Sequence, residues 1–229
     1  PVVLAVPADV SPVEAAEGVV ERVTPSAKGA VSFKLNPALQ NRITISGIPG
    51  SIRVEASDVR HLIAGYGWYL KNIAKVHLSW NGNRLALPSP LPAPARPVTI
   101  ESPWKTVFAY NYCTLSYTTA FWDWKRWQQE IDFLALNGFT HALVTAGLEK
   151  TWEDFLIGLG YPRDKAIRFI PNPAFAAWWN MGNLEGHGGP LSQRQIDRMA
   201  QLGKRIVSRM EQLGMTPVPV SYTHLTLPT

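Results

Sequence analysis

The clearest strand and helix signals in the chain lie in residues 107–145, which read VFAYNYCTLSYTTAFWDWKRWQQEIDFLALNGFTHALVT. A short apolar strand is expected over 107–110. Asp123 then caps a helix that ends at Gly138, and a second strand is expected over 140–145. The buried face of that helix recurs at helical spacing and comprises Trp124, Trp127, Ile131, Leu134 and Ala135. This order predicts two parallel strands joined by a right-handed helical crossover.

The alternation continues downstream. Helical turns are expected over 152–159, and Ser192 caps a helix that ends at Gly214 and leads into a third strand over 216–220. The predicted inward positions of this helix are Ile196, Met199, Leu202, Ile206, Met210 and Leu213. Such a pattern fits an open α/β sheet or a (β/α)8 barrel. No glycine-rich phosphate loop follows a strand, so we favour the TIM barrel. A whole barrel needs ~250 residues, so residues 104–220 would form its first strands and helices, truncated.

Upstream, the composition changes at residues 87–97, which read LPSPLPAPARP and hold five prolines. Proline cannot continue a helix or a central strand, so we expect a Pro-rich linker over residues 88–103. Residues 1–87 are expected to form a small α+β N-terminal domain. Its expected elements are a helix over 13–23, strands over 30–35, 42–46 and 52–55, a helix from Asp58 to about Lys75, and a hairpin over 76–87.

Composition narrows the class of protein. Of 229 residues, 46% are hydrophobic and 17% are charged, and no apolar run reaches the ~18 residues of a membrane span, so we expect a soluble globular protein with no membrane partner. The net charge is +5, but the basic residues are scattered, which argues against nucleic acid as a partner. The single cysteine, Cys113, excludes an internal disulfide. No H-x-x-H or C-x-x-C spacing occurs, so neither a metal nor a cofactor is expected.

Aromatic residues concentrate in the second half. Of 24 aromatic residues, 18 lie between Trp104 and Trp179, and these include seven of the nine tryptophans. Such a cluster forms either a heavy core or a pocket wall for the flat faces of sugars or bases. Two kinds of protein use such a pocket: a non-catalytic carbohydrate-binding protein, and a single-strand nucleic-acid binder that stacks bases on tryptophan.

In both architectures the chemistry lies where the strands end. The first strand leads into Asn111 and Cys113, and the second leads into Glu149. Each has an ordinary structural explanation, since Cys113 fits a small buried apolar side chain and Glu149 fits a helix N-terminus. A long loop is expected over 171–190, where Trp178 and its neighbour Trp179 either line a pocket or plug the barrel mouth.

Several longer motifs resemble one family. They are NYCTLSY at 111–117, WDWKRW at 122–127, EIDFLALNG at 130–138, AWWNMGNL at 177–184, GGPL at 188–191 and GMTPV at 214–218. In this order they resemble the α-N-acetylglucosaminidase family of glycoside hydrolases, over about 110 residues. The first 90 residues resemble, more weakly, the small N-terminal module of that family.

The resemblance implies removal of terminal α-linked N-acetylglucosamine with retention, by two glutamates held ~5 Å apart. In the family both glutamates lie well downstream of the AWWNMGNL motif, so no catalytic residue is expected in these 229 residues. The implied partner is a glycan with a terminal N-acetylglucosamine. The implied sugar contacts are Asn111, Cys113, Glu149, Trp178 and Met181, with Trp178 as an apolar wall and Asn111 and Glu149 as hydrogen-bonding groups. The resemblance also implies a secreted, periplasmic or lysosomal location.

Both ends of the chain carry expectations of their own. The apolar run Val2–Val6 could be the last part of a signal peptide. Residues 221–229, SYTHLTLPT, do not resemble the family's continuation and look like a translated sequencing adapter, so we predict a non-native tail there.

Overall fold

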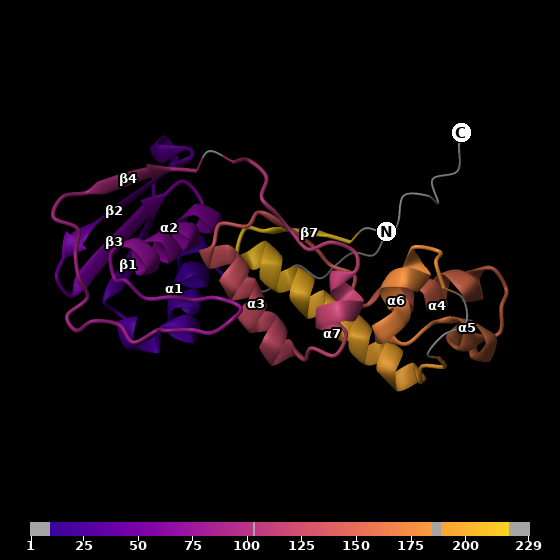
Figure 1. Ribbon diagram of the computed structural model, residues 1–229. Helices are drawn as coiled ribbons and strands as arrows, with labels where there is room; N and C mark the ends of the chain where they lie inside the picture. Colours follow the sequence, from indigo (N-terminus) through magenta and orange to yellow (C-terminus); the bar gives the residue numbers. More distant parts are fainter. Residues whose placement is uncertain (1–9, 103, 185–188, 220–229) are drawn as a thin grey trace.

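The computed structural model describes residues 10–102, 104–184 and 189–219. The expected signal-peptide remnant and the expected tail over 221–229 lie outside the described residues. Figure 1 shows a small sheet with two helices at one end, helices α4–α6 at the other end, and α3 beside α7 between them. The helices are α1 (Pro12–Val23), α2 (Val59–Asn72), α3 (Trp124–Leu136), α4 (Leu148–Gly158), α5 (Arg163–Phe169), α6 (Pro173–Asn180) and α7 (Gln193–Gln212), with short turns η1 (Pro25–Ala27), η2 (Pro37–Leu39) and the π-helix η3 (Leu115–Thr119). The strands are β1 (Val31–Leu35), β2 (Arg42–Ile48), β3 (Ser51–Ala56), β4 (Val98–Glu101), β5 (Phe108–Ala109), β6 (His141–Leu143) and β7 (Thr216–Val218).

The N-terminal domain is an α+β unit, as predicted. Its sheet has the order β1-β3-β2-β4, in which β1 runs parallel to β3 and the other neighbours are antiparallel. Apolar and polar residues alternate along β3, so that Ile52 and Val54 are buried while Ser51 and Arg53 face solvent. Helices α1 and α2 cover this sheet, and the Tyr66 ring of α2 packs edge-on against Phe33 of β1. Burial of one sheet face under two helices thus builds the core of this domain.

The Pro-rich segment differs from the predicted linker. Its second half, Val98–Glu101, is β4, which pairs antiparallel with β2, so a linker over 88–103 is wrong for these residues. Its first half crosses the domain, where the Leu91 carbonyl accepts from Gly50 N (2.8 Å) and the Pro92 carbonyl accepts from the Tyr69 hydroxyl (3.0 Å). Proline loses its N–H but keeps its carbonyl, so an extended Pro-rich segment can still be bound as an acceptor.

The hairpin expected over 76–87 is present only in minimal form, as one antiparallel residue pair with two backbone hydrogen bonds of 2.9 and 2.7 Å. The structure has a single bridge there, between His77 and Arg84, and the Ser79 hydroxyl and amide close the intervening turn with Gly82 and Asn83. The pairing does not extend beyond this bridge, and the segment packs on the domain through the buried Val76 and the partly buried Leu78 and Leu87.

The second half is the first part of a (β/α)8 barrel, as predicted. Strands β5, β6 and β7 are adjacent and parallel in that order, with Ala109 opposite Ala142 and Ala142 opposite Pro217. Helices α3 and α7 make the crossovers, and both have the predicted caps at Asp123 and Ser192. No helix in the described part of the chain is long and apolar enough to cross a membrane.

Helix α3 packs against both halves of the molecule. Its Ile131 and Leu134 are buried in one continuous apolar core that contains residues of the N-terminal domain and of α7. Helix α2 approaches α3 closely at Gly67, where an added Cβ would lie 1.9 Å from the Leu136 carbonyl oxygen. A bidentate ion pair between Arg22 of α1 and the buried Asp132 of α3, at 2.7 and 2.8 Å, joins the same surfaces. The N-terminal domain is therefore packed directly onto the barrel.

Helices α4, α5 and α6 form a further layer, the α4–α6 layer. The loop expected over 171–190 is wrong in its first half, because Pro173–Asn180 is α6. Asn172 caps this helix and Pro173 occupies its first turn, where a missing N–H costs nothing. Residues 185–188 of the expected loop lie outside the described residues. Ile170 and Leu191 pack against Ile196 of α7 in a small apolar cluster, which joins this layer to α7.

Candidate functional site

The turn that follows β5 holds the first two predicted sugar contacts. The Asn111 Oδ1 atom accepts hydrogen bonds from the Thr114 amide and hydroxyl, both at 3.1 Å, which fixes the side chain in an Asx turn. Cys113 is half-buried, and its carbonyl accepts from the amides of Ser116 and Tyr117 at the start of η3. Both residues therefore stand at the carboxyl end of β5, as predicted.

Glu149 stands at the carboxyl end of β6, at the start of α4. Its carboxylate is buried, with 4% exposure of the residue, and accepts from the Gly147 amide at 3.2 Å. Burial raises the pKa of Glu149 from 4.5 to about 7, and the backbone hydrogen bonds only partly oppose this. Gly147 has φ +95°, and Gly203 of α7 comes so close that a Cβ would lie 2.3 Å from the Ala146 oxygen. Two glycines thus let α7 close over this turn.

Helix α6 brings Trp178 to the β5 side. The Ser116 hydroxyl donates to the Pro173 carbonyl (2.8 Å) and accepts from the Ala177 amide (3.0 Å), so η3 and α6 are bonded together. The Trp178 ring lies edge-on to Tyr117 with centroids 5.0 Å apart. Met181 caps the end of α6. The sequence identified Trp178 but not Ser116 and Tyr117, because the helix that brings them together was read as a loop.

The two adjacent tryptophans have different roles. Trp179 is buried against Trp152 and Phe169, with ring centroids 4.7 and 5.4 Å away. Trp178 is half-buried. Of the two alternatives for this pair, the structure assigns core packing to Trp179 and leaves Trp178 available as a pocket wall. That all five predicted residues contact one sugar stays a prediction.

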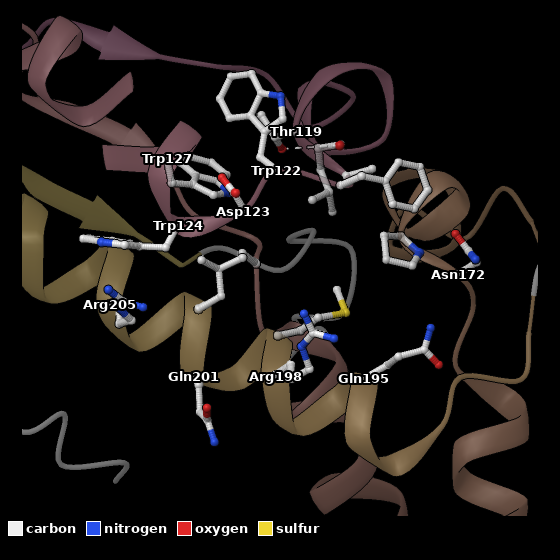
Figure 2. A pocket seen from close by; sticks show the side chains of 17 residues that line it. Thr119, Trp122, Asp123, Trp124, Trp127, Asn172, Gln195, Arg198, Gln201 and Arg205 are labelled. Carbon is white, nitrogen blue, oxygen red and sulfur yellow. Dashed lines mark hydrogen bonds between the residues drawn. The ribbon is translucent and has the colours of Figure 1, made fainter. Parts of the chain in front are cut away.

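Three cavities lie near these elements. A cavity of about 10 Å³, room for one water at most, is lined by Asn111, Tyr110 and Thr145 at the ends of β5 and β6. A larger cavity of about 430 Å³ lies between the start of α3 and α7 (Figure 2). Its aromatic walls come from α3 and the residues before it, and none of the five predicted sugar contacts lines it. A third, of about 460 Å³, lies between α3 and the 78–85 segment of the N-terminal domain.

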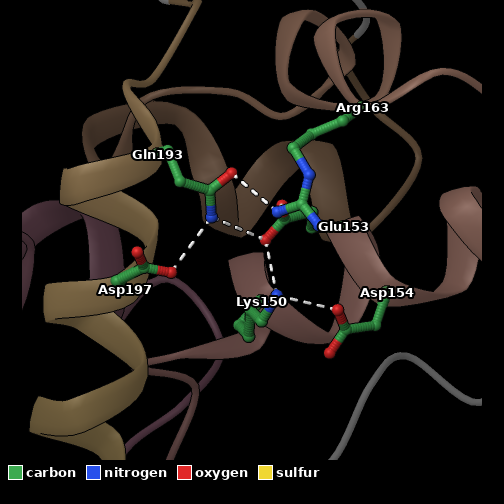
Figure 3. A network of polar contacts seen from close by, with 6 residues as sticks. All are labelled: Lys150, Glu153, Asp154, Arg163, Gln193 and Asp197. Carbon is green, nitrogen blue, oxygen red and sulfur yellow. Dashed lines mark hydrogen bonds and ion pairs between the residues drawn. The ribbon is translucent and has the colours of Figure 1, made fainter.

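A second buried carboxylate on α4, Glu153, is fully engaged in a structural network (Figure 3). Its two oxygens accept from Arg163 (2.6 Å), Lys150 (2.9 Å) and Gln193 (3.1 Å). The amide of Gln193 also donates to Asp197 on the next turn of α7. This network ties α4 to α5 and α7, and it leaves Glu153 little capacity for chemistry. Within the described residues, no group of three or more His, Cys, Asp or Glu side chains gathers as a metal site requires.

Comparisons with known proteins agree with this geometry. Residues 107–226 match the model of the alpha-N-acetylglucosaminidase (NAGLU) TIM-barrel domain, and residues 14–93 match the model of the NAGLU N-terminal domain. The human alpha-N-acetylglucosaminidase is 37% identical over 182 residues, which are 80% of this chain and 24% of that protein.

Solved structures give the same result. A family 89 glycoside hydrolase from Clostridium perfringens, in complex with 2-acetamido-1,2-dideoxynojirimycin, superposes with a TM-score of 0.87 at 29% identity, over 93% of this chain and 25% of that chain. A variant of the same enzyme in complex with its substrate GlcNAc-α-1,4-galactose gives the same TM-score and identity, over 93% and 24%. The chain spans about a quarter of the length of these relatives. Two family models matched in order over both halves of one fold show that the chain belongs to the alpha-N-acetylglucosaminidase family of glycoside hydrolases.

Proposed function

We propose that this chain is the N-terminal part of a glycosidase that releases terminal α-linked N-acetylglucosamine with retention. The observation that carries the proposal is the arrangement of the predicted contacts at the strand ends. Asn111 and Cys113 follow β5, Glu149 follows the adjacent parallel β6, and α6 holds Trp178 against η3. In a barrel this edge is where substrates bind. The binding partner would be a glycan with a terminal N-acetylglucosamine.

Each predicted contact has a chemical role in this proposal. The half-buried indole of Trp178 offers an apolar face to the sugar ring. Asn111 and Glu149 offer polar groups to its hydroxyls, and Glu149, with a pKa raised to about 7, is mostly protonated in mildly acidic solution and then donates as well as accepts. Cys113 and Met181 would complete the wall. A few polar groups on an apolar surface are typical of a small-molecule site.

The catalytic pair would come from sequence beyond residue 229. Retaining cleavage needs an acid and a nucleophile ~5 to 5.5 Å apart. At the described strand ends, Glu149 supplies one carboxyl, and Glu153 one turn further along α4 is bound by Arg163 and Lys150. One carboxyl cannot serve both roles, so we assign no catalytic residue to this chain.

The test compares two proteins with an aryl α-N-acetylglucosaminide. The 229-residue chain should show no hydrolysis. The longer gene product, extended to the length of its relatives, should release N-acetylglucosamine in the α-anomeric form. Robust turnover by the 229-residue chain that disappears in Glu149→Gln would contradict the assignment of the catalytic pair to downstream sequence.

A non-catalytic carbohydrate-binding protein is the second candidate. The half-buried Trp178 beside Tyr117 favours it, since an aromatic wall binds sugars without a carboxylate pair. Binding of N-acetylglucosamine by the longer gene product without any hydrolysis would support this candidate over the first.

The proposal includes a secreted, periplasmic or lysosomal location, on the strength of the family alone. Fractionation of the host cells followed by detection of the longer gene product tests it. Recovery of that protein solely from the cytoplasmic fraction would contradict it.

A further inference from the structure

A buried carboxylate in the middle of α3 links three distant segments. Glu130 is 1% exposed, and its Oε1 atom accepts hydrogen bonds from the Tyr110 hydroxyl (2.8 Å) and from the Trp80 indole N–H (2.9 Å). Its Oε2 atom forms an ion pair with Arg126 Nη2 at 2.9 Å, one helical turn earlier. A buried carboxylate is costly unless it is partnered: among the described residues, Oε1 has two hydrogen bonds, whereas Oε2 has the ion pair with Arg126 but no hydrogen bond.

The hydrogen bond between Tyr110 and Glu130 restrains the backbone just before Asn111. Tyr110 has φ +75°, a left-handed conformation that a residue with a bulky side chain rarely adopts. Such a conformation persists when its surroundings over-determine it. Here the hydroxyl is bound to Glu130, and the ring meets Trp127 edge-on at 6.4 Å. Burial, and then the Glu130 carboxylate, raise the pKa of the Tyr110 phenol, so the donor keeps its proton.

Asn111 comes directly after this residue. Because the peptide plane between them is rigid, the direction in which Tyr110 leaves β5 sets where the Asn111 side chain starts. Asn111 then closes its turn with Thr114 and also lines the small cavity at the strand ends. A change of Tyr110 to an ordinary conformation would swing this turn away from the end of β6.

The hydrogen bond from Trp80 connects the N-terminal domain to Glu130. Trp80 lies in the 76–87 loop, and its side chain is largely in solvent at 63% exposure. The indole N–H is bound to Glu130 and the ring packs against Phe133 of α3, with centroids 5.1 Å apart. The two donors share a single oxygen of Glu130, so a shift of one affects the other.

We propose that Glu130 is a positioning residue for the sugar site: through the Tyr110 hydroxyl it fixes the turn that presents Asn111, and through the Trp80 indole it couples the N-terminal domain to that turn. Glu130 does not touch the sugar. The inference rests on the proposed function for the part that concerns sugar, and on the contacts above for the part that concerns the turn.

The first experiment measures the affinity of the longer gene product for N-acetylglucosamine. Tyr110→Phe removes one hydroxyl from a charged acceptor and should weaken binding about tenfold. Glu130→Ala should weaken it at least as much. Glu130→Gln keeps an amide oxygen for both donors and should stay within about threefold of the original protein. Trp80→Phe should cost about two- to threefold. Because both donors act through Glu130, Trp80→Phe combined with Tyr110→Phe should fall short of the product of the single effects.

Matched controls remove the same groups elsewhere. Tyr161→Phe deletes an exposed hydroxyl and is the control for Tyr110→Phe. Trp104→Phe deletes an exposed indole N–H and is the control for Trp80→Phe. Neither should change the affinity. Equal sugar affinity for the original protein, Tyr110→Phe and Glu130→Gln would overturn the positioning role, even if Glu130→Ala fails to fold.

A second readout keeps this inference separate from the proposed function. In the unliganded 229-residue chain, the NMR signals of the Asn111 side-chain amide should shift in Tyr110→Phe and stay in place in Tyr161→Phe. Unshifted signals in Tyr110→Phe would overturn the claim that Glu130 holds the turn. If the original longer protein binds no N-acetylglucosamine, the proposed function and the sugar part of the inference both fall. The Asn111 signals then still decide whether Glu130 fixes the turn.

Discussion

Two regions of this molecule are built in different ways. The N-terminal domain and α3 share one apolar core, closed by the tight contact of Gly67 with Leu136. The α4–α6 layer meets α7 in a small apolar cluster around Ile170, and the Glu153 network ties its helices together and to α7. The first region therefore has the larger apolar core, and the second has a smaller one supplemented by the Glu153 network. Because apolar burial is the larger source of stability, the first region should open last.

The predicted sugar contacts draw on both regions. Asn111 belongs to the first, because Tyr110 and Glu130 attach its turn to α3. Glu149 and Trp178 belong to the second, on α4 and α6. In such a site, Asn111 lies on a turn attached to the shared core, whereas Glu149 and Trp178 lie on the helices of the α4–α6 layer. The predictions below test how far the two regions differ.

The largest effect is expected from a cavity in the shared core. Ile131→Ala deletes a fully buried side chain of α3 and should lower the free energy of unfolding by about 4 kcal/mol. Ile170→Ala, its counterpart in the small cluster, should cost about 2 kcal/mol because fewer neighbours lose contact. Urea unfolding of both variants measures the two values. Equal costs would show that the layer is as well packed as the core.

The next effect comes from an added methyl group. Gly67→Ala places a Cβ against the Leu136 carbonyl, where backbone would have to move, and should destabilise by about 3 kcal/mol. Gly158→Ala, at the end of α4, meets no atom within 4 Å. It should stabilise by about 0.5 kcal/mol through the helix propensity of alanine. Thermal unfolding of the pair provides the comparison, and a neutral Gly67→Ala would refute the close α2–α3 contact.

Much of this arrangement follows from the sequence, and the exceptions have physical causes. The alternation of apolar runs and capped helices predicted the three parallel strands, because apolar spacing and helix caps depend only on residues that are close in sequence. β4 was missed because five prolines mark a linker by composition, whereas only the tertiary fold shows that β2 has a free edge for Val98–Glu101. The sequence did hold a signal for α6, the Asn-Pro pair at its start, which fits an N-cap followed by Pro in the first turn.

The site was predictable in part for the same reason. Asn111, Cys113 and Glu149 follow predicted strands, so the fold class alone places them at strand ends. Glu130 could not be found in this way, because its partners lie 50 and 20 residues away and meet it only after α3 has packed. From the sequence alone, Glu130 is expected to be an ordinary polar residue of a helix.

The last effect depends on pH. The folded-state pKa of Glu149, about 7, lies above its usual 4.5, so the folded protein binds more protons between these values and loses stability as the pH rises from 4.5 to 7. Glu149→Gln removes this titration. At pH 8 the variant should be more stable than the original chain by about 3 kcal/mol, and near pH 4 the two should be equal.

Urea unfolding at several pH values measures this difference. Asp58→Asn is a useful contrast, because hydrogen bonding to His61 lowers the pKa of Asp58 to about 2 despite burial. Its stabilising contribution is lost at the acidic end, as the pH falls from 3.8 toward 2. A Glu149→Gln variant whose stability relative to the original chain is the same at pH 4 and pH 8 would show that this carboxyl is solvated.

The most direct test of a sugar site that spans both regions is a crystal structure of the longer gene product with N-acetylglucosamine bound. We predict that the sugar contacts the Asn111 side chain, on the turn attached to the shared core, and the Trp178 ring of the α4–α6 layer, each within about 4 Å. A sugar that touches neither residue, and lies instead in the cavity between α3 and α7, would contradict the assignment.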